Sequence, residues 1–331
     1  MSSEKYRSPQ DIRSVAVIGT GSVGASWAAL FLAHGMEVLA YDPSEGAEAR
    51  AIAFVRAAWP ALVELKIADA VVPPLERLRF YATAGDAAAL ADLIQENVPE
   101  KPELKARVLA EISGAAGAEK IILSSTGGIP PSQLQEACAH PERFVVVHPF
   151  NPSHLIPLVE VVGGKKTASA VVEWALGFAR YVGKQPIRLN VEATGHMTNR
   201  LQFALVREAV HCLVEGVASA RDIDAAVRYG LGPRWTLMGS LLTLHLAGGP
   251  GGMKGILDHA GKAIEEWWTP MSQPQLTPEV TARLVAASAE VSDGQPIDQW
   301  VAWRDEQLVN VIKLQVASEQ DEPKGSQKGQ P

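Results

Sequence analysis

The 331-residue sequence has little cysteine, with Cys138 and Cys212 as the only two. Their spacing matches neither a metal-ligand nor a redox motif, which excludes a disulfide scaffold and a cysteine-based metal site. Such sparse cysteine is typical of a reducing compartment. We therefore expect a cytoplasmic protein without a bound metal.

Long apolar runs and an excess of positive charge are also missing. No stretch of about 18 uninterrupted apolar residues is present, so we expect no membrane span. The first 14 residues are polar and contain no apolar segment of the kind found in a signal peptide. The net charge is −7 with no basic cluster, which argues against a nucleic-acid partner.

Strands that alternate with helices fill the first part of the chain. Apolar, β-branched runs such as "SVAVIG" (14–19) and "MEVLAYD" (36–42) alternate with Ala-rich segments of helical length. This order predicts an α/β fold of Rossmann type with a mainly parallel sheet. From about residue 190 the spacing is helical throughout, which predicts an all-α second domain.

Two domains and a tail therefore follow from the pattern. The expected limits are 1–189 for the α/β domain, 190–315 for the helical domain and 316–331 for a polar, disordered tail.

A glycine-rich turn follows the first strand and opens a helix. Its pattern is Gly19-x-Gly21-x-x-Gly24, and the helix begins at Ser22 and Val23. Glycines at these positions permit a tight turn, close approach of a pyrophosphate to the backbone, and close helix–strand packing. The first helical amides would then face the phosphates. The alternative is an ordinary turn between strand and helix.

The end of the second strand favours the functional interpretation. Asp42 lies 18 residues after Gly24, where an acidic side chain binds a ribose 2′-hydroxyl and repels a 2′-phosphate. We therefore predict NAD rather than NADP as the cofactor.

His148 and Glu160 lie twelve positions apart in "HPFNPSHLIPLVE", at two neighbouring strands. Oxidation of an alcohol needs a base for the hydroxyl proton, and imidazole suits that task at neutral pH. A carboxylate on the other ring nitrogen would fix the tautomer. A structural histidine is the alternative that the two residues alone leave open.

Several motifs resemble those of the 3-hydroxyacyl-CoA dehydrogenase family over nearly the whole chain. They are "GTGSVG", "ENVPEKPELK" (96–105), "SSTGGIPPSQL" (124–134), "HPFNPSHLIPLVEVVGG" and "ATGHMTNRL" (193–201). The resemblance implies that His148 is the general base, that Glu160 orients it, and that Asn199 contacts the substrate oxygen. It also implies that Glu100 and Lys105 line the cofactor site.

The chain departs from the family pattern at two positions. Gly127 stands where the family usually has a serine that donates to the reacting oxygen; Ser125, Thr126, water or a substrate group could replace that donor. His196 replaces the usual phenylalanine, either as a substrate contact or as a buried neutral ring. The residues predicted to contact substrate are Ser125, Asn151, His196 and Trp235.

The branch most similar to this chain acts on small free 3-hydroxy acids and includes L-carnitine dehydrogenase and L-gulonate 3-dehydrogenase. We therefore expect NAD-dependent oxidation of a small L-3-hydroxy acid of the L-carnitine or L-gulonate type. The resemblance also implies a homodimer formed through the helical domain. The alternatives are oxidation of an acyl-CoA thioester, or a catalytically decayed NADH-binding structural protein.

Overall fold

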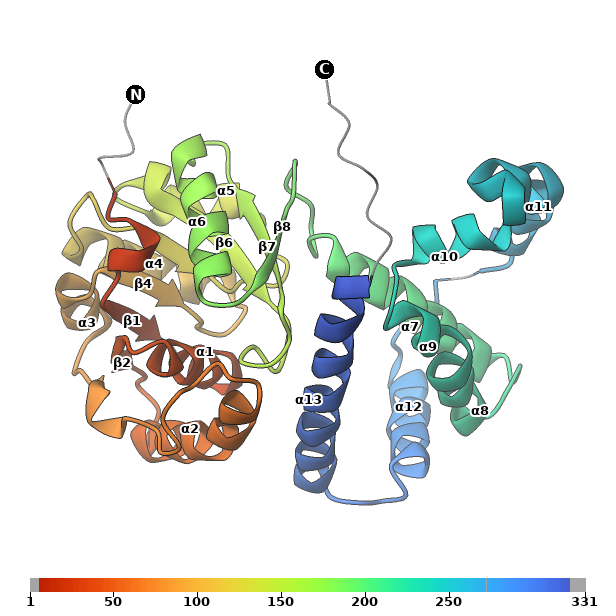
Figure 1. Cartoon of the computed structure of the whole chain (residues 1–331), viewed down its shortest axis with the longest axis horizontal. Helices are drawn as coiled ribbons and strands as arrows, with labels where there is room; N and C mark the ends of the chain where they lie inside the picture. Colours follow the sequence, from red (N-terminus) through yellow and green to blue (C-terminus); the bar gives the residue numbers. More distant parts are fainter. Residues whose placement is uncertain (1–5, 272, 322–331) are drawn as a thin grey trace. The chain divides into compact units, whose positions relative to one another are not determined.

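The computed structural model describes residues 6–271 and 273–321, and the chain forms two compact units, residues 1–200 and 201–331. The elements of both can be followed by colour in Figure 1. The predicted boundary near Asn190 falls between the last strand and helix α7. The predicted tail from residue 316 begins inside helix α13, and 322–331 lie outside the described residues.

The first unit is built on one eight-stranded sheet with the order β3-β2-β1-β4-β5-β6-β7-β8. All neighbouring pairs are parallel except β6 and β7. The strands are β1 Ser14–Ile18, β2 Glu37–Tyr41, β3 Leu78–Phe80, β4 Leu93–Glu96, β5 Ile122–Ser124, β6 Phe144–Pro149, β7 Leu158–Gly163 and β8 Gln185–Arg188.

Helices cover both faces of this sheet. They are α1 Ser22–Ala33, α2 Ala47–Glu64, α3 Ala84–Leu90, α4 Pro102–Ala115, α5 Pro131–Leu134 and α6 Ser169–Tyr181. The 3₁₀ turns are η1 Pro9–Asp11, η2 Leu75–Arg77, η3 Gln135–Ala137 and η4 Pro141–Arg143. The predicted α/β class with a Rossmann-type sheet is confirmed.

The alternation along the strands explains the two layers. In β1, Val15 and Val17 pack with the side chains of α1, α2 and α6 in one core, whereas Ala16 and Ile18 pack with those of α3, α4 and α5 in the other. Successive side chains of a strand point to opposite faces, so a strand buried on both sides has to be apolar throughout. This is why the predicted strands are continuous apolar runs.

The second unit is helical, as predicted, within the described residues. Its elements are α7 Thr198–Val214 (which begins in the first unit), α8 Ala220–Ala225, the π-helix η5 Ala226–Leu231, α9 Gly232–Trp235, α10 Ser240–Ala247, η6 Gly249–Gly251, α11 Gly252–Trp268, α12 Pro278–Val291 and α13 Ile297–Asp321. Thr277 caps α12 by accepting a hydrogen bond from the Val280 amide, and Pro278 follows as the first helical residue. None of the helices in the described part of the chain has the length and apolar character needed to cross a bilayer.

Candidate active site

The glycine-rich turn lies at the carboxyl end of β1, where the strand order reverses between β1 and β4. Gly19 has a φ of +88°, and a Cβ there would lie 2.9 Å from the Asn97 carbonyl oxygen. A Cβ on Gly24 would lie 1.8 Å from the Gly19 carbonyl oxygen, so only glycine lets α1 approach the strand this closely. A Cβ on Gly21, in contrast, would meet nothing within 4 Å.

The open space at Gly21 fits a dinucleotide pyrophosphate. Ser22 and Val23 form the first turn of α1, and this turn contains no acidic residue. A helix N-terminus has unpaired amides and partial positive charge, which together favour a phosphate. The predicted cofactor residues of this turn therefore form one cradle.

Asp42 follows β2 directly and faces the same turn. Its Oδ2 accepts hydrogen bonds from the Thr20 amide at 2.8 Å and from Thr20 Oγ1 at 3.2 Å, while Oδ1 accepts one from the Ser44 amide at 2.9 Å. Partial burial works to raise the pKa of Asp42, but the hydrogen bonds from Ser44 and Thr20 outweigh it and lower the pKa. The carboxylate therefore stays charged at neutral pH.

Lys105, predicted to line the cofactor site, is buried and has its partners on and just after β4. Its Nζ donates to Glu96 Oε1 at 2.8 Å and to the Val98 carbonyl at 3.0 Å. Both ends of this ion pair are almost fully buried, with side-chain exposures of 1% for Lys105 and 0% for Glu96. Ser124 Oγ donates to the second oxygen of Glu96. Lys105 thus ties helix α4 to the end of β4, and Glu96 in turn ties β4 to the end of β5.

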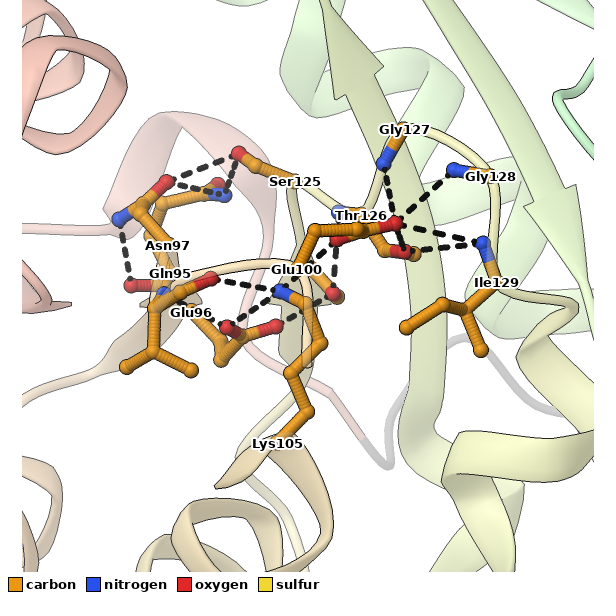
Figure 2. A network of polar contacts seen from close by, with 12 residues as sticks. Gln95, Glu96, Asn97, Glu100, Lys105, Ser125, Thr126, Gly127, Gly128 and Ile129 are labelled. Atoms are coloured by element: carbon orange, nitrogen blue, oxygen red, sulfur yellow. Dashed lines mark hydrogen bonds and ion pairs between the residues drawn. The ribbon is translucent and has the colours of Figure 1, made fainter. Parts of the chain in front are cut away.

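Glu100 holds the loop that follows β5. Its Oε1 accepts hydrogen bonds from Thr126 Oγ1 at 2.6 Å and from the amides of Gly127, Gly128 and Ile129 at 3.1, 3.1 and 3.3 Å. Figure 2 shows this carboxylate facing the three successive amides. Three consecutive amides form a concave anion site. Here a side chain of the same chain fills it.

The carbonyl side of the same loop is held by the turn before α7. Three consecutive carbonyls each accept one hydrogen bond: Thr126 from His196 Nε2 at 3.0 Å, Gly127 from Asn199 Nδ2 at 2.8 Å, and Gly128 from the Gly195 amide at 3.2 Å. The loop is therefore fixed on both its amide and its carbonyl side.

His196 is fully buried, and its tautomer follows from its partner. A carbonyl can only accept, so the proton lies on Nε2 of His196. Burial lowers the pKa of this ring and nearby His148 lowers it further, against the effect of the bond to Thr126. Nδ1 has no hydrogen-bond partner among the described residues. His196 is thus a neutral ring packed 5.3 Å from the ring of His148.

The structure brings His148 and Glu160 into direct contact. They are opposite residues of the antiparallel pair β6·β7, which explains their spacing of twelve positions. His148 Nδ1 lies 2.8 Å from Glu160 Oε2, with exposures of 7% for His148 and 0% for Glu160. Since Glu160 accepts, Nδ1 carries the proton and Nε2 keeps a lone pair. Nε2 makes no hydrogen bond to any described residue.

The two hydroxyls nearest to Gly127 are already committed. Ser125 Oγ donates to Asn97 Oδ1 at 2.8 Å and accepts from Trp27 Nε1 and Gln95 Nε2. Thr126 Oγ1 donates its only hydrogen to Glu100. Neither can therefore donate to a substrate without breaking a bond that it makes here.

Two further residues were predicted to contact the substrate, and neither takes part in the hydrogen bonds described above. Asn151 is exposed in the connection between β6 and β7. Trp235 ends α9 in the second unit and is 40% exposed.

The sequence interpretation missed several supporting residues, namely Glu96, Gln95, Asn97, Thr198 and Lys184. Thr198 donates from both its amide and its hydroxyl to Glu160 Oε1. Lys184 is buried and donates to the carbonyls of Ser153 and Ile156 in the connection after His148. Glu96 stands in the quoted "ENVPE" segment, so its buried place at the end of a strand could have been noticed.

Comparison with known proteins gives the family. Residues 14–192 match the NAD binding domain of 3-hydroxyacyl-CoA dehydrogenase, and residues 195–288 match its C-terminal domain. The chain belongs to the 3-hydroxyacyl-CoA dehydrogenase family. It is an NAD-dependent oxidoreductase, which confirms the resemblance and the cofactor predicted from the sequence.

Named relatives align with nearly the full length of this chain. L-carnitine dehydrogenase of Streptomyces coelicolor is 45% identical over 92% of this chain and 96% of its own, and that of Bacillus cereus is 45% identical over 92% of each. Among solved structures, 5-formyl-3-hydroxy-2-methylpyridine 4-carboxylic acid 5-dehydrogenase, an NAD⁺-dependent dismutase, is 32% identical with a TM-score of 0.79 over 92% of this chain and 98% of that one. The 3-hydroxybutyryl-CoA dehydrogenase of Escherichia coli is 32% identical with a TM-score of 0.61, covering 80% of this chain and 54% of that one.

Proposed function

We propose that this protein oxidises the 3-hydroxyl of a small, free L-3-hydroxy acid to the 3-oxo acid, with L-carnitine as the first candidate substrate. The observation that carries the proposal is the buried His148–Glu160 pair, whose Nε2 lone pair is open while Nδ1 is held at 2.8 Å. The names of the relatives that are 45% identical support L-carnitine in particular.

His148 is the proposed general base. Its Nε2 takes the hydroxyl proton as the C–H hydride leaves, and Glu160 stabilises the imidazolium that results. Asn199 uses one Nδ2 hydrogen on the Gly127 carbonyl and keeps a second for the substrate oxygen. Since both residues are held through the turn at 195–199, their geometry is set before the substrate arrives.

NAD⁺, when bound, supplies the acceptor for the hydride. The residues proposed to hold it are Gly19, Gly21, Ser22, Val23, Gly24 and Asp42. Glu100 and Lys105 act on the same site by fixing the segment after β4 and the loop after β5. Asp42 favours NAD over NADP because its charge opposes a 2′-phosphate.

A free acid is favoured over an acyl-CoA by charge. From residue 190 onward the sequence has 12 Lys and Arg against 17 Asp and Glu, a net of −5. Such a charge does not favour the phosphates of coenzyme A. Of the five tryptophans in this part, Trp303 already has Arg228 over its ring at 5.9 Å.

The helical unit is the proposed dimerisation domain. Among its described residues only Val210 and Val309 are hydrophobic side chains that are buried. A groove in this unit is lined by Val206, Val210, Leu213, Ile223 and Leu284, from α7, α8 and α12. Such exposed apolar surface fits a second copy of the chain.

Initial rates of NAD⁺ reduction with purified protein test the proposal. The panel contains L-carnitine, L-gulonate, L-3-hydroxybutyrate and 3-hydroxybutyryl-CoA, with His148→Ala as the control that lacks the base. We expect turnover of at least one free acid and loss of that turnover in His148→Ala. If only the thioester is oxidised, the proposal is wrong and the protein is an acyl-CoA dehydrogenase of the 3-hydroxy type.

A pyridine aldehyde acid is a second candidate substrate. The observation that favours it is the TM-score of 0.79 with the 5-formyl-3-hydroxy-2-methylpyridine 4-carboxylic acid enzyme, at 32% identity. The aldehyde therefore belongs in the same panel. Binding of NADH without turnover of any compound would favour a structural protein.

A further inference from the structure

Gly127 has no backbone reason to be glycine. Its φ lies outside the left-handed range that favours this residue, unlike that of Gly195. Its amide and its carbonyl are both held, by Glu100 and by Asn199. The position of its Cα is thus well defined, and so is the direction that a side chain would take.

A side chain at residue 127 would point at the catalytic groups proposed above. A Cβ built there lies 3.3 Å from His148 Nε2 and 3.5 Å from Asn199 Nδ2. The His148 ring has little room to give way, because Glu160 holds Nδ1 and the rings of Phe150 and His196 lie 4.8 and 5.3 Å from it. Even one methyl group would therefore reduce the space beside Nε2.

The substrate needs that same space. A hydroxyl that gives its proton to Nε2 has to lie about 2.6 to 3.2 Å from it, so the reacting carbon and its substituents occupy the next shell. The hydroxyls of Ser125 and Thr126 donate to Asn97 and Glu100, so neither donates a hydrogen bond into this space. What fills the space beside Gly127 is then a part of the substrate or a water molecule.

We propose that Gly127 determines the substrate class, by leaving room beside His148 Nε2 for a bulky substituent on the reacting carbon of the 3-hydroxy acid. This inference rests on the proposed function and adds a selectivity to it. Substrates with a trimethylammoniomethyl or a polyhydroxylated group at C3 are preferred, and L-3-hydroxybutyrate, which carries only a methyl group there, leaves the space empty.

The test compares Gly127→Ala with wild type on a bulky and a small substrate. We expect kcat/KM for L-carnitine or L-gulonate, whichever is used, to fall about 10-fold or more, as is typical when one methyl group too many meets a fitted pocket. The value for L-3-hydroxybutyrate should change by less than about 3-fold, since a methyl substituent still fits.

Gly128→Ala is the matched control. It adds the same methyl group one residue later, where the Cβ would meet the backbone of Gly195 at 3.4 Å and no atom of His148. The ratio of the two kcat/KM values should stay near that of wild type, whatever happens to the absolute rates. Melting temperature and NADH affinity on the same preparations detect misfolding.

The possible results distinguish failure of the role of Gly127 from failure of the proposed function. An equal loss on both substrates in Gly127→Ala, or no loss on either, overturns the inference and leaves the proposed function in place. A wild-type preference for L-3-hydroxybutyrate also overturns it, and points to water beside Gly127. A wild-type protein that oxidises no 3-hydroxy acid overturns the proposed function, and with it this inference.

Discussion

The two carboxylate oxygens of Glu160 have separate partners. Oε2 accepts from His148 Nδ1, and Oε1 accepts from the Met197 amide, the Thr198 amide and Thr198 Oγ1 at 3.0, 2.8 and 3.1 Å. Burial works to raise the pKa of Glu160, but the hydrogen bonds with His148 and Thr198 outweigh it and lower the pKa. One charged residue therefore connects the proposed base to the start of α7.

Glu160→Gln should inactivate the protein through the tautomer of His148. Three donors face Oε1, so the amide oxygen of glutamine takes that place and its NH₂ group faces His148. Nδ1 then has to accept, the ring proton moves to Nε2, and the lone pair of the proposed base is lost. We expect kcat to fall about 10² to 10⁴-fold with unchanged NADH affinity. A normal kcat in folded protein would contradict the role of His148.

The lowered pKa of the buried Lys184 allows us to predict how the free energy of unfolding depends on pH. Burial lowers its pKa to about 7, and no carboxylate lies within ion-pair distance of it among the described residues. In the unfolded chain the side chain keeps its proton to about pH 10.4, so between these values the unfolded state binds more protons. Stability should therefore rise with pH across this window, by up to about 1.4 kcal/mol per pH unit.

Urea unfolding of wild type and Lys184→Met between pH 7 and 9 measures this effect. The free energy of unfolding of wild type should increase relative to that of the variant as pH rises, because methionine has no proton to release. Lys166→Met, at an exposed position, is the control and should show no such trend. A constant difference between wild type and Lys184→Met would show that Lys184 titrates normally.

At the scale of elements, a carboxylate from another part of the chain binds backbone amides at each end of β1, and the two can be compared. Asp42 accepts from the Thr20 amide at the carboxyl end of β1, and Asp92 accepts from the Arg13 and Ser14 amides at the other end. Only the carboxyl end of β1 carries the glycine-rich turn. Replacing Asp42 therefore tests cofactor recognition, whereas replacing Asp92 tests support of the strand alone.

Asp42→Ala should weaken NADH binding about 10 to 100-fold, the usual effect of losing a hydrogen bond to a charged group. NADPH binding should weaken less or improve, because the repelling charge is gone. Asp92→Ala should lower stability without changing the ratio of the two affinities. Fluorescence titration measures both, and equal affinity of wild type for NADH and NADPH would refute the role of Asp42.

Some of this arrangement could be predicted because its signals are local in the sequence. The glycines of the turn and Asp42 lie within 24 consecutive residues, and each has a chemical reason to stand where it does. His148 and Glu160 lie on adjacent strands of a hairpin, so their contact follows once both strands are recognised. The apolar runs gave the strands and therefore the class of fold.

The remaining contacts join segments that no pattern connects. Glu100 binds amides 27 to 29 positions away, and His196 binds a carbonyl 70 positions away. Lys105 is buried together with Glu96, and in the sequence alone Glu96 cannot be told from a glutamate on the surface. Such partners become visible only when the strand order is known.

At the scale of the whole molecule, the helical unit determines the expected assembly. Trp267 and Trp268 are 63% and 62% exposed, on a unit with very few buried hydrophobic side chains among its described residues. We expect a homodimer by sedimentation at micromolar concentration.

Val206→Asp, in the groove between α7, α8 and α12, should shift this dimer toward monomer. Val72→Asp, at an exposed position of the first unit, is the control with the same change of charge. A wild-type monomer at micromolar concentration would disprove the assembly.

The hydrogen bonds on Glu160 come from a later stretch of the chain than the contacts of the glycine-rich turn. The glycine-rich turn has its partners within residues 14 to 98. The donors on Glu160 Oε1 come only at residues 197 and 198. The part of the site proposed to hold the dinucleotide and the part proposed to move the proton therefore rest on contacts that different stretches of the chain supply, and a change in one stretch can spare the other.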